Sequence, residues 1–157
     1  RTKGCGISVR ACTTAAAAGQ LDVLWWLRAE GCNWDKQTCV AAIIHGQLEV
    51  LKWLHDNGCP WDTHACNRAI RNGHLAILQW LRSKGYACNK HACDIAAQCG
   101  HLDVLKWLRA DGCSWNKAVC DVATRNGHRA VLDWIHANGC PCGHTAQLSP
   151  VTPAEPA

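Results

Sequence analysis

The segment GHLDVLKWL, at residues 100–108, decides the fold because it returns at a fixed interval along the chain. Close variants of it recur with a period of 27, and they begin at Gly19 (GQLDVLWWL), Gly46 (GQLEVLKWL), Gly73 (GHLAILQWL) and Gly127 (GHRAVLDWI). A second glycine follows each of the five at the same distance: Gly31, Gly58, Gly85, Gly112 and Gly139. Five copies in one register indicate a tandem array in which each unit packs on its neighbours.

Each unit is predicted to contain two helices. In residues 101–111, HLDVLKWLRAD, the apolar side chains recur at the three- and four-residue spacing of a helical stripe. Asp103 lies in the first turn and Arg109 near the last, as the helix dipole favours, and Gly112 ends the helix. The alanine-rich segment 91–99 predicts a partner helix that a neighbouring helix can approach closely. Neither helix is long enough to be stable alone, so each must bury its apolar face against the next unit.

The unit HACDIAAQCGHLDVLKWLRADGCSWN, at residues 91–116, resembles an ankyrin repeat, whose pattern runs TPLHLAAxxGHLxVVxLLLxxGADVN. Ala96–Ala97 and Gly100–His101–Leu102 match that pattern, and the resemblance extends over residues 8–142. It implies an all-α fold, an α-solenoid of stacked antiparallel helix pairs. The period of 27 is shorter than the family's period of about 33. The missing residues fall within 116–120, where the family carries a protruding β-turn finger, so we expect shortened loops.

The array is expected to occupy residues 8–142, in the units 8–34, 35–61, 62–88, 89–115 and 116–142. Residues 1–7 align with 82–88, so we expect them to end a preceding repeat, with further repeats upstream in the native chain. Arg129 replaces the leucine of the other units at its position, which suits a last unit that faces water. Residues 143–157 contain three prolines and are expected to form a flexible C-terminal tail.

The composition excludes several classes of protein. Of the 157 residues, 48% are hydrophobic and 18% are charged, with a formal net charge of +4, so the chain is not a highly charged disordered segment. It contains no apolar run long enough to span a membrane. The thirteen cysteines, taken as unpaired thiols, predict a reducing intracellular compartment, either cytoplasm or nucleus.

The cysteines have two interpretations, a metal array or redox relay and a set of small core side chains. Stacked helices lie about 8–10 Å apart, so equivalent thiols in adjacent units are too far apart for a zinc ion or a disulfide. Pairing inside a unit, for example Cys32 with Cys39, stays open. So does a metal site in CPCGH, formed by Cys140, Cys142 and His144, although it lacks a fourth ligand. We predict no metal and no cofactor.

Tryptophan also recurs with the repeat. Two series stand where the family places core leucine and valine: Trp26, Trp53, Trp80, Trp107 and Trp134, and Trp34, Trp61 and Trp115. They could form a stacking platform for bases or sugars, but the periodicity favours core positions in which each indole N–H finds an acceptor. Trp25 occupies the position of Lys52 and Lys106, so we expect it to be exposed and available for contact.

No enzyme is expected. The chain contains no P-loop, no G-x-S-x-G and no H-E-x-x-H motif, and no nucleophile recurs beside His74, His101 and His128. The resemblance implies a non-catalytic protein–protein interaction module or scaffold that presents a concave repeat surface to another protein. One alternative is a structural subunit packed in a larger assembly, which the exposed first unit and Trp25 suggest. Another is an RNA-binding solenoid, suggested by the tryptophans and a pI of about 8.5.

The partner is expected to bind on the concave face, at the short connections and the exposed end of each first helix. The candidate residues in the second and third units are Asp35, Lys36, Gln37, Ile44, His45, Asp62, Thr63, His64, Arg71 and Asn72. Those in the fourth and fifth units are Asn89, Lys90, His91, Gln98, Asn116, Lys117, Arg125 and Asn126. Their charge is mixed, with a basic excess.

Overall fold

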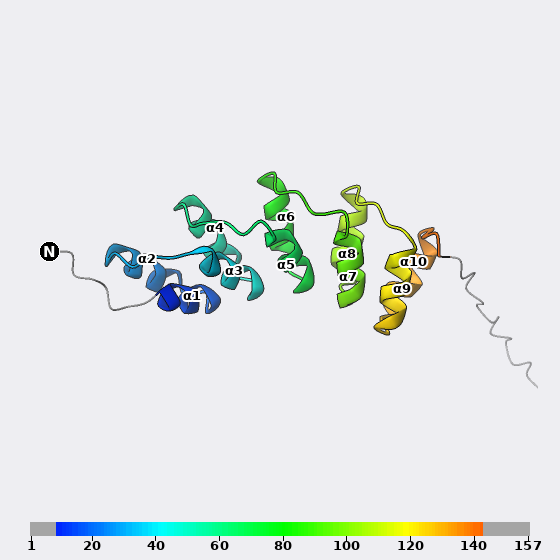
Figure 1. Ribbon diagram of the computed structural model, residues 1–157, viewed down its shortest axis with the longest axis horizontal. Coiled ribbons are helices and arrows are strands. Elements are labelled where there is room, and N and C mark those ends of the chain that lie inside the picture. Colours follow the sequence, from blue (N-terminus) through cyan, green and yellow to red (C-terminus); the bar gives the residue numbers. More distant parts are fainter. Residues whose placement is uncertain (1–8, 143–157) are drawn as a thin grey trace, which may run out of the picture.

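The computed structural model describes residues 9–142, which form ten helices and no strand (Figure 1). In chain order the helices are α1 (Val9–Ala17), α2 (Leu21–Ala29), α3 (Lys36–Ile44), α4 (Leu48–Asp56), α5 (Ala65–Arg71), α6 (Leu75–Ser83), α7 (Ala92–Cys99), α8 (Leu102–Ala110), α9 (Lys117–Arg125) and α10 (Arg129–Ala137). The predicted all-α solenoid is therefore confirmed. We call α1, α3, α5, α7 and α9 the first helices and the other five the second helices. None of the ten is long and apolar enough to cross a membrane.

Glycine ends both helices of each pair. At the end of α1, Gly19 has a φ of +72°, and its N–H donates to the Ala16 carbonyl. The N–H of Gln20 donates to the Ala15 carbonyl. Together the two bonds form the Schellman motif, whose left-handed residue costs glycine little because it has no Cβ. The short connection then leads directly into α2, so the two helices of a unit run antiparallel.

The first helices form the closely packed side of the stack. Each of them contacts the first helix of the next unit, whereas neighbouring second helices contact each other less. The alanines at one repeat position are buried between these helices and let them approach closely: Ala15, Ala42, Ala69, Ala96 and Ala123. Because the units are closest on this side, the stack bends toward it, and the first helices line its concave side (Figure 1).

The second helices supply most of the large core side chains. Leucines at two repeat positions are buried against the first helices: Leu24, Leu51, Leu78 and Leu105, and Leu27, Leu54, Leu81 and Leu108. Together with the buried alanines and cysteines they make one apolar cluster that runs through all five helix pairs. No unit has a closed core of its own, so the folding of each unit depends on its neighbours.

A row of hydrogen bonds, which we call the inter-unit clamp, ties each unit to the one before it. The acceptors are carbonyl oxygens at the ends of the first helices, which have no partner within their helix. Ring nitrogen Nε2 of a histidine lies 2.9–3.0 Å from the acceptor in three clamps, His74 to Ile44, His101 to Arg71 and His128 to Gln98. In the fourth, Gln47 Nε2 donates to the Ala17 carbonyl at 3.2 Å. The recurring histidines therefore mark the starts of second helices and also join the units.

Seven of the eight tryptophans in the two series lie at the edge of the apolar cluster and pack against it, so the predicted core positions are right only in part. Trp26 is 49% exposed, and the other seven of the two series are half-buried. An indole is too large for the narrow space between alanine-faced helices, so the rings cover the connections between units instead. The ring centroids are 5.5–6.1 Å apart in three pairs: Trp34 with Trp53, Trp61 with Trp80, and Trp115 with Trp134. The buried indole N–H of Trp61 has no acceptor among the described residues, which also contradicts the expectation.

Candidate functional site

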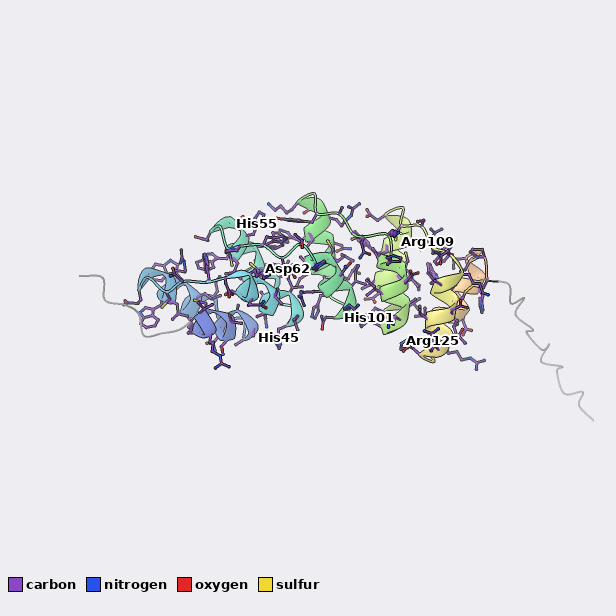
Figure 2. The ribbon with its side chains drawn as sticks, in the orientation of Figure 1. His45, His55, Asp62, His101, Arg109 and Arg125 are labelled. Atoms are coloured by element: carbon purple, nitrogen blue, oxygen red, sulfur yellow. A yellow bond between two sulfur atoms is a disulfide. The ribbon has the colours of Figure 1, made fainter. Side chains whose placement is uncertain are left out.

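The predicted binding residues lie at both ends of the first helices. Exposed side chains near the helix starts are Lys36, Gln37, Thr63, His64, Lys90, His91 and Lys117. Exposed side chains near the helix ends are Ile44, His45, Arg71, Asn72, Gln98, Arg125 and Asn126. In Figure 2, His45 and Arg125 lie along one edge of the molecule, and His55 and Arg109 lie along the opposite edge. The predicted exposed residues thus occupy the two ends of the first helices, and the middle of these helices lies between them.

Four of the predicted residues make the same hydrogen bond near the starts of the first helices. Oxygen atoms of their side chains accept a hydrogen bond, 2.8–3.2 Å long, from the backbone N–H two residues later: Asp35, Asp62, Asn89 and Asn116. For Asp35 and Asn116 this bond is the N-cap of α3 and α9. Asp62 and Asn89 form it in the turn before α5 and α7, whose N-cap residues are His64 and His91. Such a cap satisfies one of the N–H groups that a helix start leaves without a partner. The residues at this repeat position therefore have a structural role, whichever partner binds.

Asp62 is not available to a partner, and its assignment to the binding surface is corrected here. Its side chain is 8% exposed, and Oδ2 accepts a hydrogen bond from Arg68 Nε at 2.5 Å. Burial favours a higher pKa for the Asp62 carboxyl. The hydrogen bonds from Arg68 and from the His64 backbone N–H, together with the Arg68 charge, outweigh burial and hold this pKa below its ordinary value of 3.8.

The sequence prediction missed the middle of the first helices. Arg68, Asp94 and Asp121 are half-exposed or exposed between the predicted rows. The signal was present in the sequence, since His64, Arg68 and Arg71 follow the four- and three-residue spacing that places side chains on one helical face. We define the first-helix face by the residues at this spacing: Gln37, Ile44, His64, Arg68, Arg71, His91, Asp94, Gln98, Asp121 and Arg125.

The first-helix face is polar and carries both signs of charge. Arg68, Arg71 and Arg125 are cationic, while Asp94 and Asp121 are anionic, and Asp94 Oδ2 lies 3.1 Å from His91 Nδ1. Ile44, which is 36% exposed, adds a large apolar side chain to this face. A broad surface of this composition suits polar contacts with a second polypeptide better than the enclosure of a small molecule.

Trp25 is exposed, as expected from its repeat position. Its side chain is 65% exposed, and two further apolar side chains of α2, Val23 at 38% and Trp26 at 49%, are exposed beside it. We call these three residues the α2 apolar surface. The ring of Trp34 packs on Trp53 in the next unit. The residue one repeat before Trp34 is Ile7, which lies outside the described residues.

The cysteines meet inside units, which the sequence left open. In three units the thiol of the first helix lies close enough to a thiol in the turn after the second helix for hydrogen bonding to shift the pKa of both. The pairs are Cys39–Cys59, Cys66–Cys88 and Cys93–Cys113. The partners thus lie at opposite ends of one unit. Cys32 and Cys39, the pairing considered from sequence, belong to two successive units, and Cys39 lies close to Cys59 instead. The bond from Cys93, supported by the Arg109 charge, lowers the pKa of the Cys113 thiol to about 6 in spite of burial.

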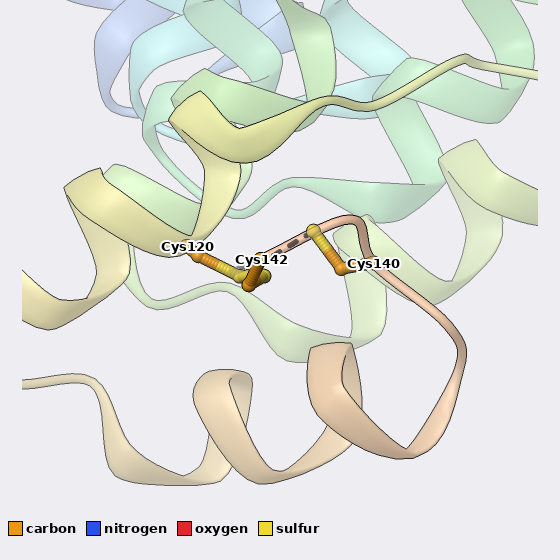
Figure 3. Close-up of side chains that lie close together, drawn as sticks. All are labelled: Cys120, Cys140 and Cys142. Atoms are coloured by element: carbon orange, nitrogen blue, oxygen red, sulfur yellow. Dashed lines mark hydrogen bonds between the residues drawn. A yellow bond between two sulfur atoms is a disulfide. The ribbon is translucent and has the colours of Figure 1, made fainter. Parts of the chain in front are cut away.

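Three sulfur atoms converge in the last helix pair (Figure 3). Cys120 of α9 forms a disulfide with Cys142, and Cys140 Sγ lies 3.4 Å from Cys120 Sγ. Burial raises the pKa of the Cys140 thiol, and Asp121 acts in the same direction while Arg109 opposes it. Of the three residues considered for a metal site in CPCGH, Cys140 and Cys142 are brought together, and His144 lies outside the described residues.

A solenoid with a polar, concave row of helices is the architecture of repeat proteins that bind other macromolecules over a surface. A family model described as ankyrin repeats, in three copies, matches residues 39–119. The chain belongs to the ankyrin repeat family. Members of this family generally mediate protein–protein interactions and are typically not enzymes. A search of curated proteins found no match.

Proposed function

We propose that this chain is a non-catalytic binding module that docks a segment of another protein on its first-helix face. The observation that carries the proposal is the recurrence of exposed polar side chains at matching positions of successive first helices, on the concave side of the stack. A rigid frame that repeats such positions can contact an extended partner at regular intervals without losing conformational entropy of its own.

Two arginines of this face are the best candidates for contact with the partner. Arg71 and Arg125 occupy the same repeat position two units apart, at the ends of α5 and α9, and both side chains are exposed. Neither forms an ion pair with another residue in the described part of the chain. Their guanidinium groups are therefore available to bind carboxylates of a partner, which arginine contacts through paired hydrogen bonds.

The test measures the affinity of two double variants for a partner protein that has been recovered by affinity capture and purified. We expect Arg71→Ala with Arg125→Ala to weaken binding by about tenfold or more, since each arginine loses a charge-assisted contact. The matched control removes two exposed cations of second helices, Lys106→Ala with Arg129→Ala. Circular dichroism checks that both variants fold. Equal affinity of the two double variants for the partner would show that the first-helix face is not the binding surface.

A second candidate function is that of a fixed subunit in a larger assembly, and the α2 apolar surface favours it. Single exposed apolar residues are common, but Trp25 and Trp26 are large and adjacent. In that case Trp25→Ser should abolish co-purification with a neighbouring subunit, while the arginine variants should not. Light scattering on the isolated chain measures the same property, because a stable monomer at high concentration argues against a fixed subunit.

An RNA-binding role receives less support from the positions of the rings. The Arg28 and Arg109 guanidinium groups lie 4.1 and 4.2 Å from the ring centroids of Trp34 and Trp115, and Trp61 stacks on Tyr86 at 5.0 Å. These faces are already used inside the chain, so they are poorly placed to stack on bases. Binding of single-stranded RNA that weakens steeply with added salt would favour this third function.

A further inference from the structure

Two different turn positions bring a thiol to the same place in a unit. In the pairs Cys39–Cys59 and Cys93–Cys113 the second cysteine occupies the earlier of these positions, directly after the glycine that ends the second helix. In Cys66–Cys88 it stands two positions later, because Tyr86 occupies the earlier one. Both turn positions therefore lie within reach of the first-helix thiol.

The last helix pair has cysteine at both turn positions, Cys140 at the earlier and Cys142 at the later, and both face Cys120. The Cys142 N–H donates to the Cys140 carbonyl at 2.7 Å, which closes a tight turn of three residues with Pro141 at its centre. The three sulfur atoms lie within 4.8 Å of one another, and no other group of three ligating side chains does so among residues 9–142.

We propose that the last helix pair, when reduced, binds one zinc ion through the thiolates of Cys120, Cys140 and Cys142. Zinc prefers sulfur ligands and takes them at about 2.3 Å, which places tetrahedral neighbours about 3.8 Å apart. Cys120 Sγ and Cys140 Sγ are 3.4 Å apart, and all three sulfur atoms lie within 4.8 Å of one another. Small adjustments of the side chains would therefore bring the sulfurs to the separation that zinc requires.

Among residues 9–142 no fourth ligating side chain joins the three cysteines, so we assign the fourth position to a solvent molecule. A hollow of about 490 Å³ opens beside Cys120 and is lined by Asp121, Thr124, Arg125, Leu132 and His136. Structural zinc sites have four protein ligands, whereas three protein ligands leave one position for water or an added ligand. The proposal does not depend on which partner the first-helix face binds.

The disulfide in the structure is the oxidised, metal-free form of the same site. Two equivalents of a small-molecule thiol reduce the Cys120–Cys142 bond, giving two protein thiols and one small-molecule disulfide. Zinc then displaces the protons of three thiols and releases them to solvent. A small-molecule disulfide oxidises the zinc-bound form, joins Cys120 to Cys142 and releases the ion. Three protons from solvent complete the step, two for the small-molecule thiols that form and one for the Cys140 thiolate.

The test titrates Co²⁺ into the full chain after reduction with a phosphine, which adds no competing thiol to the solution. We expect one Co²⁺ per chain, a thiolate-to-cobalt charge-transfer band, and displacement of Co²⁺ by Zn²⁺. X-ray absorption of the zinc form should count three sulfur ligands and one oxygen. Cys140→Ser should lower the affinity by at least about tenfold, because it removes one of three ligands.

The matched control is Cys113→Ser, at the same repeat position in a unit with only two thiols, and it should leave the affinity for Co²⁺ unchanged. The oxidised Cys140→Ser variant retains Cys120 and Cys142, so its circular dichroism shows whether the fold is preserved. If the reduced chain binds no Co²⁺, or if Cys113→Ser weakens binding as much as Cys140→Ser does, the three-thiolate site is wrong and Cys120–Cys142 is a structural disulfide only.

Discussion

At the scale of single residues, the buried carboxylate of Asp62 shows how a residue chosen for its polarity can serve the fold instead. Its two oxygens have different tasks, since Oδ1 accepts the His64 N–H in the turn before α5 and Oδ2 binds Arg68. The equivalent Asp35 has only the capping bond and is exposed. The difference comes from Arg68, which has no cationic counterpart in α3, where Ala41 occupies the equivalent position.

Asp62→Asn is therefore expected to lower the free energy of unfolding by about 1 kcal/mol at pH 7, because asparagine has one acceptor oxygen for two donors and Arg68 is partly exposed. The folded-state pKa of Asp62 lies below the ordinary 3.8, so its contribution is complete above that value. It is lost as the pH falls through the lower, folded-state pKa. Urea unfolding of both proteins between pH 7 and pH 2 should show the difference shrink only in acid. A difference that is the same at pH 7 and pH 2 would contradict the assignment.

Cys113 is expected to be the most reactive of the half-exposed thiols. Its pKa of about 6 makes it mostly thiolate at pH 7, and it lines a surface hollow with Arg82 and Lys90. Brief treatment with iodoacetamide followed by mass spectrometry should label Cys113 before the other half-exposed thiols, Cys88, Cys99 and Cys140.

Cys93→Ala removes the hydrogen bond that stabilises the Cys113 thiolate, so it should slow alkylation of Cys113 by about tenfold at pH 7. Cys39→Ala makes the same change two units away and serves as the control. Unchanged labelling of Cys113 in the Cys93→Ala variant would mean that Cys93 does not set its pKa.

At the scale of the helix pair, the glycine before each of the first four second helices has two tasks. It takes a left-handed φ, and it leaves room for the clamp side chain of the next unit. A Cβ on Gly73 would lie 2.7 Å from Nδ1 of His101, whereas a Cβ on Gly112 would meet nothing within 4 Å. The two glycines have similar positive φ values of +71° and +89°. Comparing alanine substitutions at the two positions therefore separates the effect of backbone strain from the effect of the clamp.

Gly112→Ala is expected to cost about 1–2 kcal/mol of unfolding free energy, from left-handed strain alone. Gly73→Ala should cost about 1 kcal/mol more, because His101 must move and its bond to the Arg71 carbonyl is lost. Urea unfolding measures both. In a His101→Ala background the extra cost of Gly73→Ala should disappear, since the two changes remove the same contact. Equal losses for Gly73→Ala and Gly112→Ala would show that the clamp contributes nothing.

At the scale of the whole molecule, the stack joins only neighbouring units. The first helices contact in sequence from α1 to α9, and the clamp also links adjacent units only. Such an array can open from one unit without unfolding the rest, because no contact of a distant unit is broken.

A core substitution should therefore act locally. Val131→Ala in α10, where the side chain is buried, is expected to cost about 1–2 kcal/mol and to speed amide hydrogen exchange in α9 and α10 by about tenfold. Exchange in α3 and α4 should not change. Val50→Ala is the matched variant at the same repeat position of α4, and it should speed exchange in α3 and α4. Equal acceleration along the whole chain in either variant would mean that the array opens as one cooperative unit.

The sequence by itself determined the repeat, the helix pairs and the glycines that end them, because these depend on residues within a few turns of one another. It also identified the exposed ends of the first helices and the exposure of Trp25. Only the tertiary structure decided that Asp62 is buried, that the indoles cover the unit connections, and that thiols from opposite ends of a unit meet. The periodicity assigns each residue to a face of its own helix. Which side chains meet between helices depends on how the turn after a second helix folds back over the start of the first helix in the same unit, and that path is set by tertiary packing.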